Sequence, residues 1–119
     1  MQELTHYIDG THIKGTSGRF ANVMNPATGE IQGKVPLASK DELCNAVSVA
    51  AKAQPAWGAV NPQRRARVMM KFVDLLNRDM QKLAETLSRE HGKTIPDAAG
   101  DVQRGLEVVE YCIGAPHLL

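Results

Sequence analysis

The stretch Leu37-Ala38-Ser39-Lys40-Asp41-Glu42-Leu43 marks the point at which the sequence pattern changes from that of strands to that of helices. Ser39 and Glu42 have the spacing of a capping box, in which each side chain accepts a hydrogen bond from the backbone N–H group of the other residue at the first turn of a helix. We therefore predict an α+β fold with a strand arm at residues 1–38 and a helical segment of about four α-helices at residues 39–119.

Upstream of this point, turn residues separate short strand-like stretches. Asp9-Gly10 is favoured in tight hairpins because both turn positions tolerate a positive φ angle, and it predicts a hairpin at residues 7–13. Asn25-Pro26-Ala27-Thr28-Gly29 marks a further turn between predicted strands at residues 19–24 and 31–37. One face of the strand at residues 31–37 is expected to be buried, because polar residues or proline alternate with Ile31, Gly33, Val35 and Leu37.

Downstream, the first two predicted helices are separated by proline and asparagine signals. The segment from Pro55 to Gly58 bends or ends the first helix. Asn61-Pro62 provides the cap and the first turn of the second helix. The predicted buried face of this second helix consists of Val68, Met69, Phe72, Val73, Leu75 and Leu76.

Two more helices are expected before the end of the sequence. A third helix is predicted to end at Gly92 and carries the apolar residues Met80, Leu83, Ala84 and Leu87. In the last helix, Thr94 and Asp97 form a second capping box ahead of an apolar stripe at Val102, Leu106, Val109 and Ile113. Glycines within this helix either mark the close approach of another backbone or are simply tolerated.

The composition is that of a globular chain, since 43% of the 119 residues are hydrophobic and 23% are charged. A net charge of +1 argues against a dedicated nucleic-acid-binding protein, and we interpret the basic stretch at residues 64–71 as a solvated face or a subunit contact. The sequence contains no apolar run of membrane-spanning length and no signal-peptide pattern. We therefore expect no nucleic-acid partner, no membrane partner and a cytoplasmic location.

The residue types and spacings predict no catalytic or metal-binding site. Cys44 and Cys112 lack a neighbouring base, and we expect both to be buried structural thiols. The four histidines include no pair at i and i+4, which argues against a metal site. Gly92-Lys93-Thr94 is similar to the end of a phosphate-binding loop, but Leu87 stands where that loop requires glycine. We interpret it as a helix end followed by a helix cap.

Arg104 is a candidate for ligand binding. It lies on the last predicted helix near Gly100 and Gly105, which leave space around its guanidinium group. A guanidinium can bind a carboxylate through two parallel hydrogen bonds. The alternative interpretation is an ion pair with Asp101 or Glu107.

Several short strings stand in an order that is typical of one enzyme family. They are Tyr7-Ile8-Asp9-Gly10, Asn25-Pro26-Ala27-Thr28-Gly29-Glu30, Val35-Pro36, Pro55-Ala56-Trp57, His91-Gly92-Lys93-Thr94, and Gly100-Asp101-Val102-Gln103-Arg104-Gly105 followed by Glu107-Val108-Val109-Glu110-Tyr111. Together they resemble the N-terminal segment of aldehyde dehydrogenases, and most closely the CoA-acylating methylmalonate-semialdehyde dehydrogenase branch. The resemblance runs over nearly the whole chain.

The resemblance implies an NAD-dependent oxidation of malonate or methylmalonate semialdehyde that transfers the acyl group to CoA. In the family, the nucleophilic cysteine, the general-base glutamate and the dinucleotide-contacting residues correspond to positions beyond residue 119, and neither Cys44 nor Cys112 matches the nucleophile. We therefore expect no catalytic, cofactor-binding or metal-binding residue in this chain, no bound cofactor and no activity of the chain by itself. Arg104 matches an arginine that faces the substrate carboxylate in this branch.

The resemblance also implies roles for the two parts of the chain. Family members use such N-terminal strands for oligomerisation, and the following helices resemble the start of the NAD-binding domain without its Rossmann core. Because a two-stranded hairpin is marginally stable and has unpaired edges, we expect the strand arm to self-associate or to join the remaining dehydrogenase domains. The alternative hypothesis is a non-catalytic helical interaction or oligomerisation module of the same ancestry.

Overall fold

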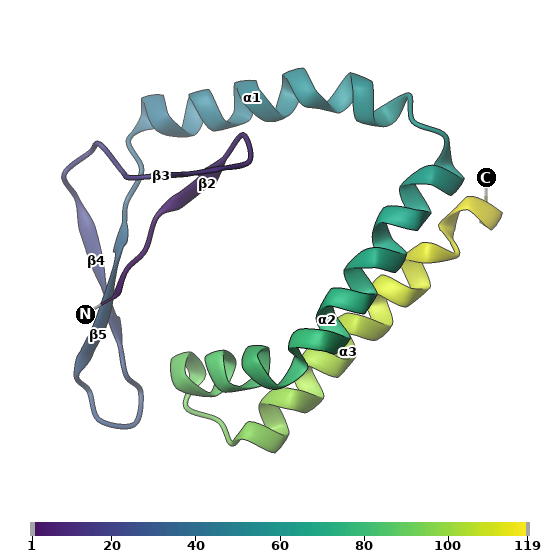
Figure 1. Ribbon diagram of the computed structural model, residues 1–119. Coiled ribbons are helices and arrows are strands. Elements are labelled where there is room, and N and C mark those ends of the chain that lie inside the picture. The colour runs from purple at the N-terminus through teal and green to yellow at the C-terminus, as the bar shows by residue number, and fades with distance from the viewer. Residues whose placement is uncertain (1, 119) are drawn as a thin grey trace. The chain divides into compact units, whose positions relative to one another are not determined.

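The computed structural model describes residues 2–118, which form two compact units with the elements shown in Figure 1. The first unit ends at Ala59 and contains β1 (Gln2–Glu3), β2 (His6–Ile8), β3 (Thr11–Ile13), β4 (Phe20–Met24), β5 (Ile31–Pro36) and α1 (Lys40–Gly58). The second unit begins at Val60 and contains α2 (Pro62–His91), α3 (Ile95–Ile113) and the 3-10 helix η1 (Ala115–Leu118). The predicted α+β class is confirmed. The predicted division at residue 38, into a strand arm for oligomerisation and a helical segment, stays a prediction.

The predicted hairpin consists of β2 and β3. The two strands are antiparallel, with Tyr7 opposite His12, and these two rings meet edge to face with centroids 5.2 Å apart. Asp9 and Gly10 have φ angles of 53° and 71° in the turn. Most other residue types avoid such angles, which explains why this dipeptide predicts the hairpin correctly.

A second sheet contains three strands in the order β1-β5-β4. The predicted turn at residues 25–29 joins β4 to β5 in an antiparallel pair, and β1 adds to the other edge of β5 in parallel, with Gln2 opposite Gly33. The sequence did not predict β1, because two residues are too few to show an alternating pattern. Gly33 is buried as expected, whereas Ile31 and Leu37 are 42% and 41% exposed.

Helix α1 begins at the predicted capping box. The backbone N–H of Glu42 donates to Ser39 Oγ at 3.2 Å, and the backbone N–H of Ser39 donates to Glu42 Oε2 at 2.7 Å. Glu42 Oε1 also accepts hydrogen bonds from the backbone N and the Oγ1 atom of Thr16, at 2.6 and 2.9 Å. These bonds, led by the one from the Ser39 backbone, lower the pKa of Glu42 to about 2. The carboxylate therefore fastens the loop after β3 to the start of α1.

Helix α2 is one continuous helix of 30 residues. The prediction of separate second and third helices is therefore wrong, and the described residues form three α-helices instead of about four. Beyond its first residue this helix contains no proline or glycine, and apolar residues continue at helical spacing from Leu76 to Met80, so nothing in this segment ends the helix. Asn61 caps its start as predicted, accepting a hydrogen bond from the backbone N–H of Gln63 at 2.9 Å.

Helices α2 and α3 run antiparallel and pack side by side (Figure 1). Gly92, with a φ angle of 87°, ends α2, and the Thr94 side chain accepts a hydrogen bond from the backbone N–H of Asp97 at 3.3 Å and caps α3. The predicted helix end is thus confirmed, and Thr94 caps α3 as predicted. The Asp97 carboxylate accepts a hydrogen bond from the Thr94 hydroxyl group at 2.7 Å, so only the Thr94 half of the predicted capping box is confirmed. The buried apolar residues of the pair are mostly small: Ala66, Ala84, Ala98 and Leu106.

The predicted buried face of the second helix is only partly covered. Met69, Val73 and Leu76 are half-buried. The prediction is wrong for the other three residues, because Val68, Phe72 and Leu75 are 52%, 44% and 44% exposed. A single neighbouring helix covers a narrower strip than the apolar stripe of α2, so its flanks stay exposed.

Candidate functional site

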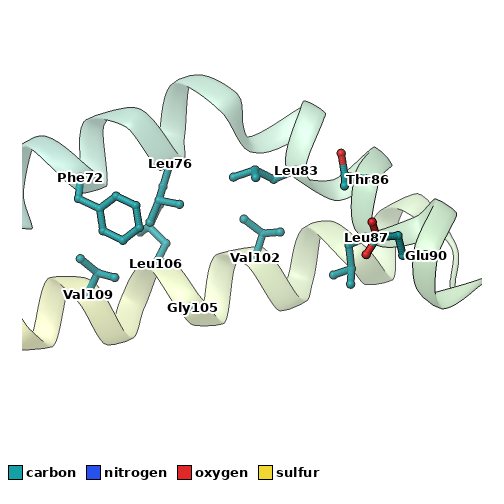
Figure 2. Close-up of a pocket in the computed structure, with 10 residues that line it drawn as sticks. All are labelled: Phe72, Leu76, Leu83, Thr86, Leu87, Glu90, Val102, Gly105, Leu106 and Val109. Carbon is teal, nitrogen blue, oxygen red and sulfur yellow. The ribbon is translucent and has the colours of Figure 1, made fainter. Parts of the chain in front are cut away.

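One face of α3 lines an apolar groove against α2, with a volume of about 440 Å³ (Figure 2). From α3 come Val102, Gly105, Leu106 and Val109. Among the residues that line the groove, Thr86 and Glu90 carry the polar side chains, and Figure 2 shows both at one end. This face of α3 therefore serves to pack against α2. The residues that line the groove include no lysine or arginine that would attract an anionic ligand.

The opposite side of α3 has a different character. Four residues follow each other there at intervals of three or four and so share one face of the helix. We call this surface the Arg104 face, and it consists of Gly100, Arg104, Val108 and Tyr111. Val108 and Tyr111 are 63% and 76% exposed. The Arg104 face thus combines a cation with exposed apolar surface.

An ion-pair cluster engages Arg104 on this face. The Arg104 Nη1 atom donates to Asp101 Oδ1 at 2.7 Å, and the Lys93 Nζ atom donates to Oδ2 of the same carboxylate. The hydrogen bond from Lys93 is the main cause that lowers the pKa of Asp101, and the charges of Lys93 and Arg104 act in the same direction. The predicted Arg104–Asp101 ion pair is confirmed. Glu107, the other predicted partner, accepts a hydrogen bond from Gln103 at 3.2 Å.

The three side chains of this cluster differ in exposure. The exposed fractions are 22% for Lys93, 35% for Asp101 and 77% for Arg104. The backbone of Lys93 is also held in place, because its carbonyl accepts a hydrogen bond from Ser88 Oγ at 2.7 Å. Lys93 and Asp101 therefore form the anchored end of the cluster, and Arg104 forms the accessible end.

The two cysteines do not lie where the sequence predicts. Both Cys44 and Cys112 are exposed, so the prediction of buried thiols is wrong. Cys44 lies on α1, which has no buried residue. Cys112 is adjacent to the half-buried Ile113, but successive residues on a helix point about 100° apart, so the two side chains do not share a face.

The remaining chemistry of the described chain is limited. Gly92-Lys93-Thr94 is the helix end and cap that the sequence indicates. Within residues 2–118, no group of three or more His, Cys, Asp or Glu side chains is arranged to hold a metal ion. None of the helices in this range is both long enough and apolar enough to cross a membrane.

Lys93 is the site residue that the sequence interpretation missed. It lies in the connection between α2 and α3, eight residues before Asp101. Helical spacing connects residues three or four apart and gives no signal across a non-helical connection. Only the path of the chain from α2 into α3 brings the Lys93 ammonium group to Asp101.

Comparisons with known proteins agree on one family. The sequence model of the aldehyde dehydrogenase family matches residues 12–119. Malonate-semialdehyde dehydrogenase of Pseudomonas aeruginosa is 44% identical over 119 residues, which are 100% of this chain and 24% of that protein.

Two solved structures match the fold of the chain closely. A Sinorhizobium meliloti protein that carries the provisional name methylmalonate-semialdehyde dehydrogenase, crystallised with NAD, has a TM-score of 0.96 and 65% identity over 99% of this chain and 24% of its own. Methylmalonate-semialdehyde dehydrogenase from Oceanimonas doudoroffii has a TM-score of 0.95 and 43% identity over 100% of this chain and 24% of its own. The chain thus spans about 24% of the length of these relatives.

Proposed function

The chain belongs to the aldehyde dehydrogenase family, and we propose that it is the N-terminal part of an NAD-dependent, CoA-acylating dehydrogenase of malonate or methylmalonate semialdehyde. The observation that carries this proposal is a match to semialdehyde dehydrogenases over essentially the whole chain, at a TM-score of 0.96 for the Sinorhizobium meliloti relative. That relative was crystallised with NAD, which supports NAD as the oxidant of the whole enzyme.

Within this enzyme we assign the substrate carboxylate to Arg104. Malonate semialdehyde carries a carboxylate as well as the aldehyde, and hydrogen bonds between a guanidinium and a carboxylate are about twice as strong as those between neutral groups. The exposed Val108 and Tyr111 on the same helix face supply apolar surface for the carbon chain of the substrate. Arg104 would therefore select carboxylated aldehydes over uncharged ones.

The donors of the Gly92-Lys93-Thr94 string do not fit a dinucleotide phosphate. In Gly92-Lys93-Thr94, the Gly92 backbone N–H donates to the Ser88 carbonyl at 2.8 Å, the Thr94 hydroxyl donates to Asp97, and the Lys93 ammonium group donates to Asp101. The donors that a phosphate would require are thus engaged. We assign neither NAD nor CoA binding to residues 2–118, and we propose that the chain is inactive by itself.

The strand arm is proposed to pair with the remaining dehydrogenase domains or with a second copy. The β2–β3 sheet has two strands of three residues each, and β4 is an edge of the other sheet. Unpaired strand edges accept further strands. The alternative, a non-catalytic interaction module, would use the apolar residues that α1 leaves exposed, namely Leu43, Val47 and Trp57.

A full-length chimera tests the proposed function. Residues 1–119 of this chain replace the matching segment of the Sinorhizobium meliloti relative, which is 65% identical. We expect the chimera to produce NADH from malonate semialdehyde, NAD and CoA, and the 119-residue chain to produce none. An inactive chimera, or NADH production by the chain alone, contradicts the proposal.

Replacing Arg104 in the chimera tests the role of this side chain. Because charge-assisted hydrogen bonds are lost, we expect Arg104→Ala to lower kcat/KM for malonate semialdehyde by about 10- to 100-fold. The value for propionaldehyde, which lacks the carboxylate, should change less than about threefold. Arg64→Ala, which removes an exposed arginine of α2, is the matched control. An equal loss with both aldehydes would exclude Arg104 from carboxylate recognition.

A further inference from the structure

We propose that Lys93 and Asp101 are positioning residues that orient Arg104 for two-point binding of a carboxylate substrate. The inference rests on the proposed function, which makes Arg104 the carboxylate-binding residue. Lys93 and Asp101 determine which edge of the Arg104 guanidinium group faces the substrate, and they set the net charge of the cluster.

Asp101 occupies one end of the guanidinium group. A guanidinium has five N–H donors in one plane, and Asp101 accepts from Nη1. The edge formed by Nε and Nη2 has no hydrogen-bond partner among residues 2–118. Arg78 shows what this edge can do, because its Nε and Nη2 atoms donate to the two oxygens of Asp79 at 3.0 and 2.7 Å. Arg104 therefore presents the edge that binds a carboxylate at two points.

Lys93 sets the net charge of the cluster. If Asp101 faced Arg104 alone, the pair would be neutral, and an incoming carboxylate would compete with Asp101 for the guanidinium group. Lys93 engages the second oxygen of Asp101, so two cations share one anion and one net positive charge remains. Arg104 is the most exposed of the three side chains and is therefore the cation that an incoming carboxylate can reach.

The anchored end of the cluster gives Arg104 a fixed support. Lys93 lies between the end of α2 and the cap of α3, and Ser88 holds its carbonyl group. Asp101 belongs to α3 itself, one helical turn before Arg104. A side chain held by such support loses less conformational entropy when it binds a ligand. Binding at two points then requires less reorganisation of Arg104.

A series of variants in the full-length chimera tests this inference. We expect Lys93→Met to raise KM for malonate semialdehyde about tenfold, because Asp101 then neutralises Arg104. The value of kcat/KM for propionaldehyde should stay within about twofold, which also reports correct folding. Lys82→Met, which removes an exposed lysine of α2 outside the cluster, is the matched control and should change neither value.

Two double variants separate charge from orientation. Lys93→Met with Asp101→Asn restores the net charge and keeps an oxygen that can accept from Arg104, so KM should return to within about threefold of the starting value. Lys93→Met with Asp101→Ala restores the charge but removes that acceptor, so KM should stay high. If the asparagine variant rescues nothing, or the alanine variant rescues equally well, the positioning role is overturned.

The outcomes also separate this inference from the function on which it rests. A selective effect of Arg104→Ala without a selective effect of Lys93→Met overturns the positioning role and leaves the proposed function standing. An Arg104→Ala variant without substrate selectivity overturns the carboxylate role itself. Equal losses with both aldehydes in Lys93→Met would show that Lys93 only stabilises the fold.

Discussion

In the first unit, the Glu42 carboxylate ties the loop after β3 to the start of α1, whereas in the second unit α2 and α3 pack around Ala66, Ala84, Ala98 and Leu106. In the described part of the first unit, the buried positions are Gly33 and Pro36, both in β5. The hydrogen bonds of a carboxylate thus contribute to the stability of the first unit, whereas the volume of buried side chains contributes to that of the second. Changes of pH and changes of side-chain volume should therefore act on different units.

The two carboxylates also differ in their partners. Glu42 accepts hydrogen bonds from backbone N–H groups and a hydroxyl group, all of them neutral. Asp101 is engaged by two cations, Lys93 and Arg104. The hydrogen bonds that Glu42 accepts from neutral donors stabilise the local fold of the first unit. The two cations of Asp101 leave a net positive charge on the surface, which can serve recognition.

The largest stability change is expected for Leu106→Ala. Leu106 is 3% exposed at the contact with α2, and removing a buried leucine side chain costs about 2–4 kcal/mol in the free energy of unfolding. Urea denaturation of the 119-residue chain, followed by circular dichroism, measures this loss. Val108→Ala is the control on the same helix, where the exposed fraction is 63% and the expected change is below about 0.5 kcal/mol. A similar loss in both variants would mean that packing is not confined to the α2-facing side.

Acidification should act on the first unit through Glu42. Its pKa is lowered from 4.5 to about 2 in the folded chain, so below pH 4.5 the unfolded chain binds a proton at Glu42 that the folded chain does not. The stabilisation is fully present above pH 4.5 and is lost as the pH falls toward 2. The protection factors of the Thr16 and Ser39 amides, which correct for the intrinsic pH dependence of hydrogen exchange, should fall over this range. In the Glu42→Gln variant these protection factors should not depend on pH. Unchanged protection at pH 2 would contradict the role of Glu42.

The smallest effect is expected for Gly105→Ala. Apart from Gly105 itself, its two chain neighbours and the nearby backbone of α3, no heavy atom lies within 4 Å of the position that a Cβ atom would take. Alanine favours a helix by about 1 kcal/mol over glycine, so Tm of the 119-residue chain should rise slightly. Gly92→Ala should lower Tm, because Gly92 has a φ angle of 87°. A decrease for Gly105→Ala in the full-length chimera would indicate a backbone packed close to this glycine in the whole enzyme, which is one of the two interpretations that the sequence leaves open.

Turns and helix ends could be predicted from the sequence because their interactions span few residues. The Asp9-Gly10 hairpin, the Ser39–Glu42 capping box and the Gly92 helix end each depend on backbone angles or hydrogen bonds within four residues. The single helix α2 could also have been predicted, since its sequence contains no helix-breaking residue beyond Pro62. The ordered strings that resemble aldehyde dehydrogenases predicted the family correctly.

The features that could be predicted from the sequence are therefore local: the turns, the caps, the helical stripes and the Arg104–Asp101 ion pair as one of the alternatives for Arg104. Contacts between more distant positions required the folded structure: Thr16 contacts Glu42 from 26 positions away, and Lys93 contacts Asp101 from eight positions away across a non-helical connection. The folded structure also shows which part of each apolar stripe is buried, because the buried part depends on the width of the neighbouring element. Contacts between distant positions follow from the path of the whole chain, and no spacing rule along the sequence encodes that path.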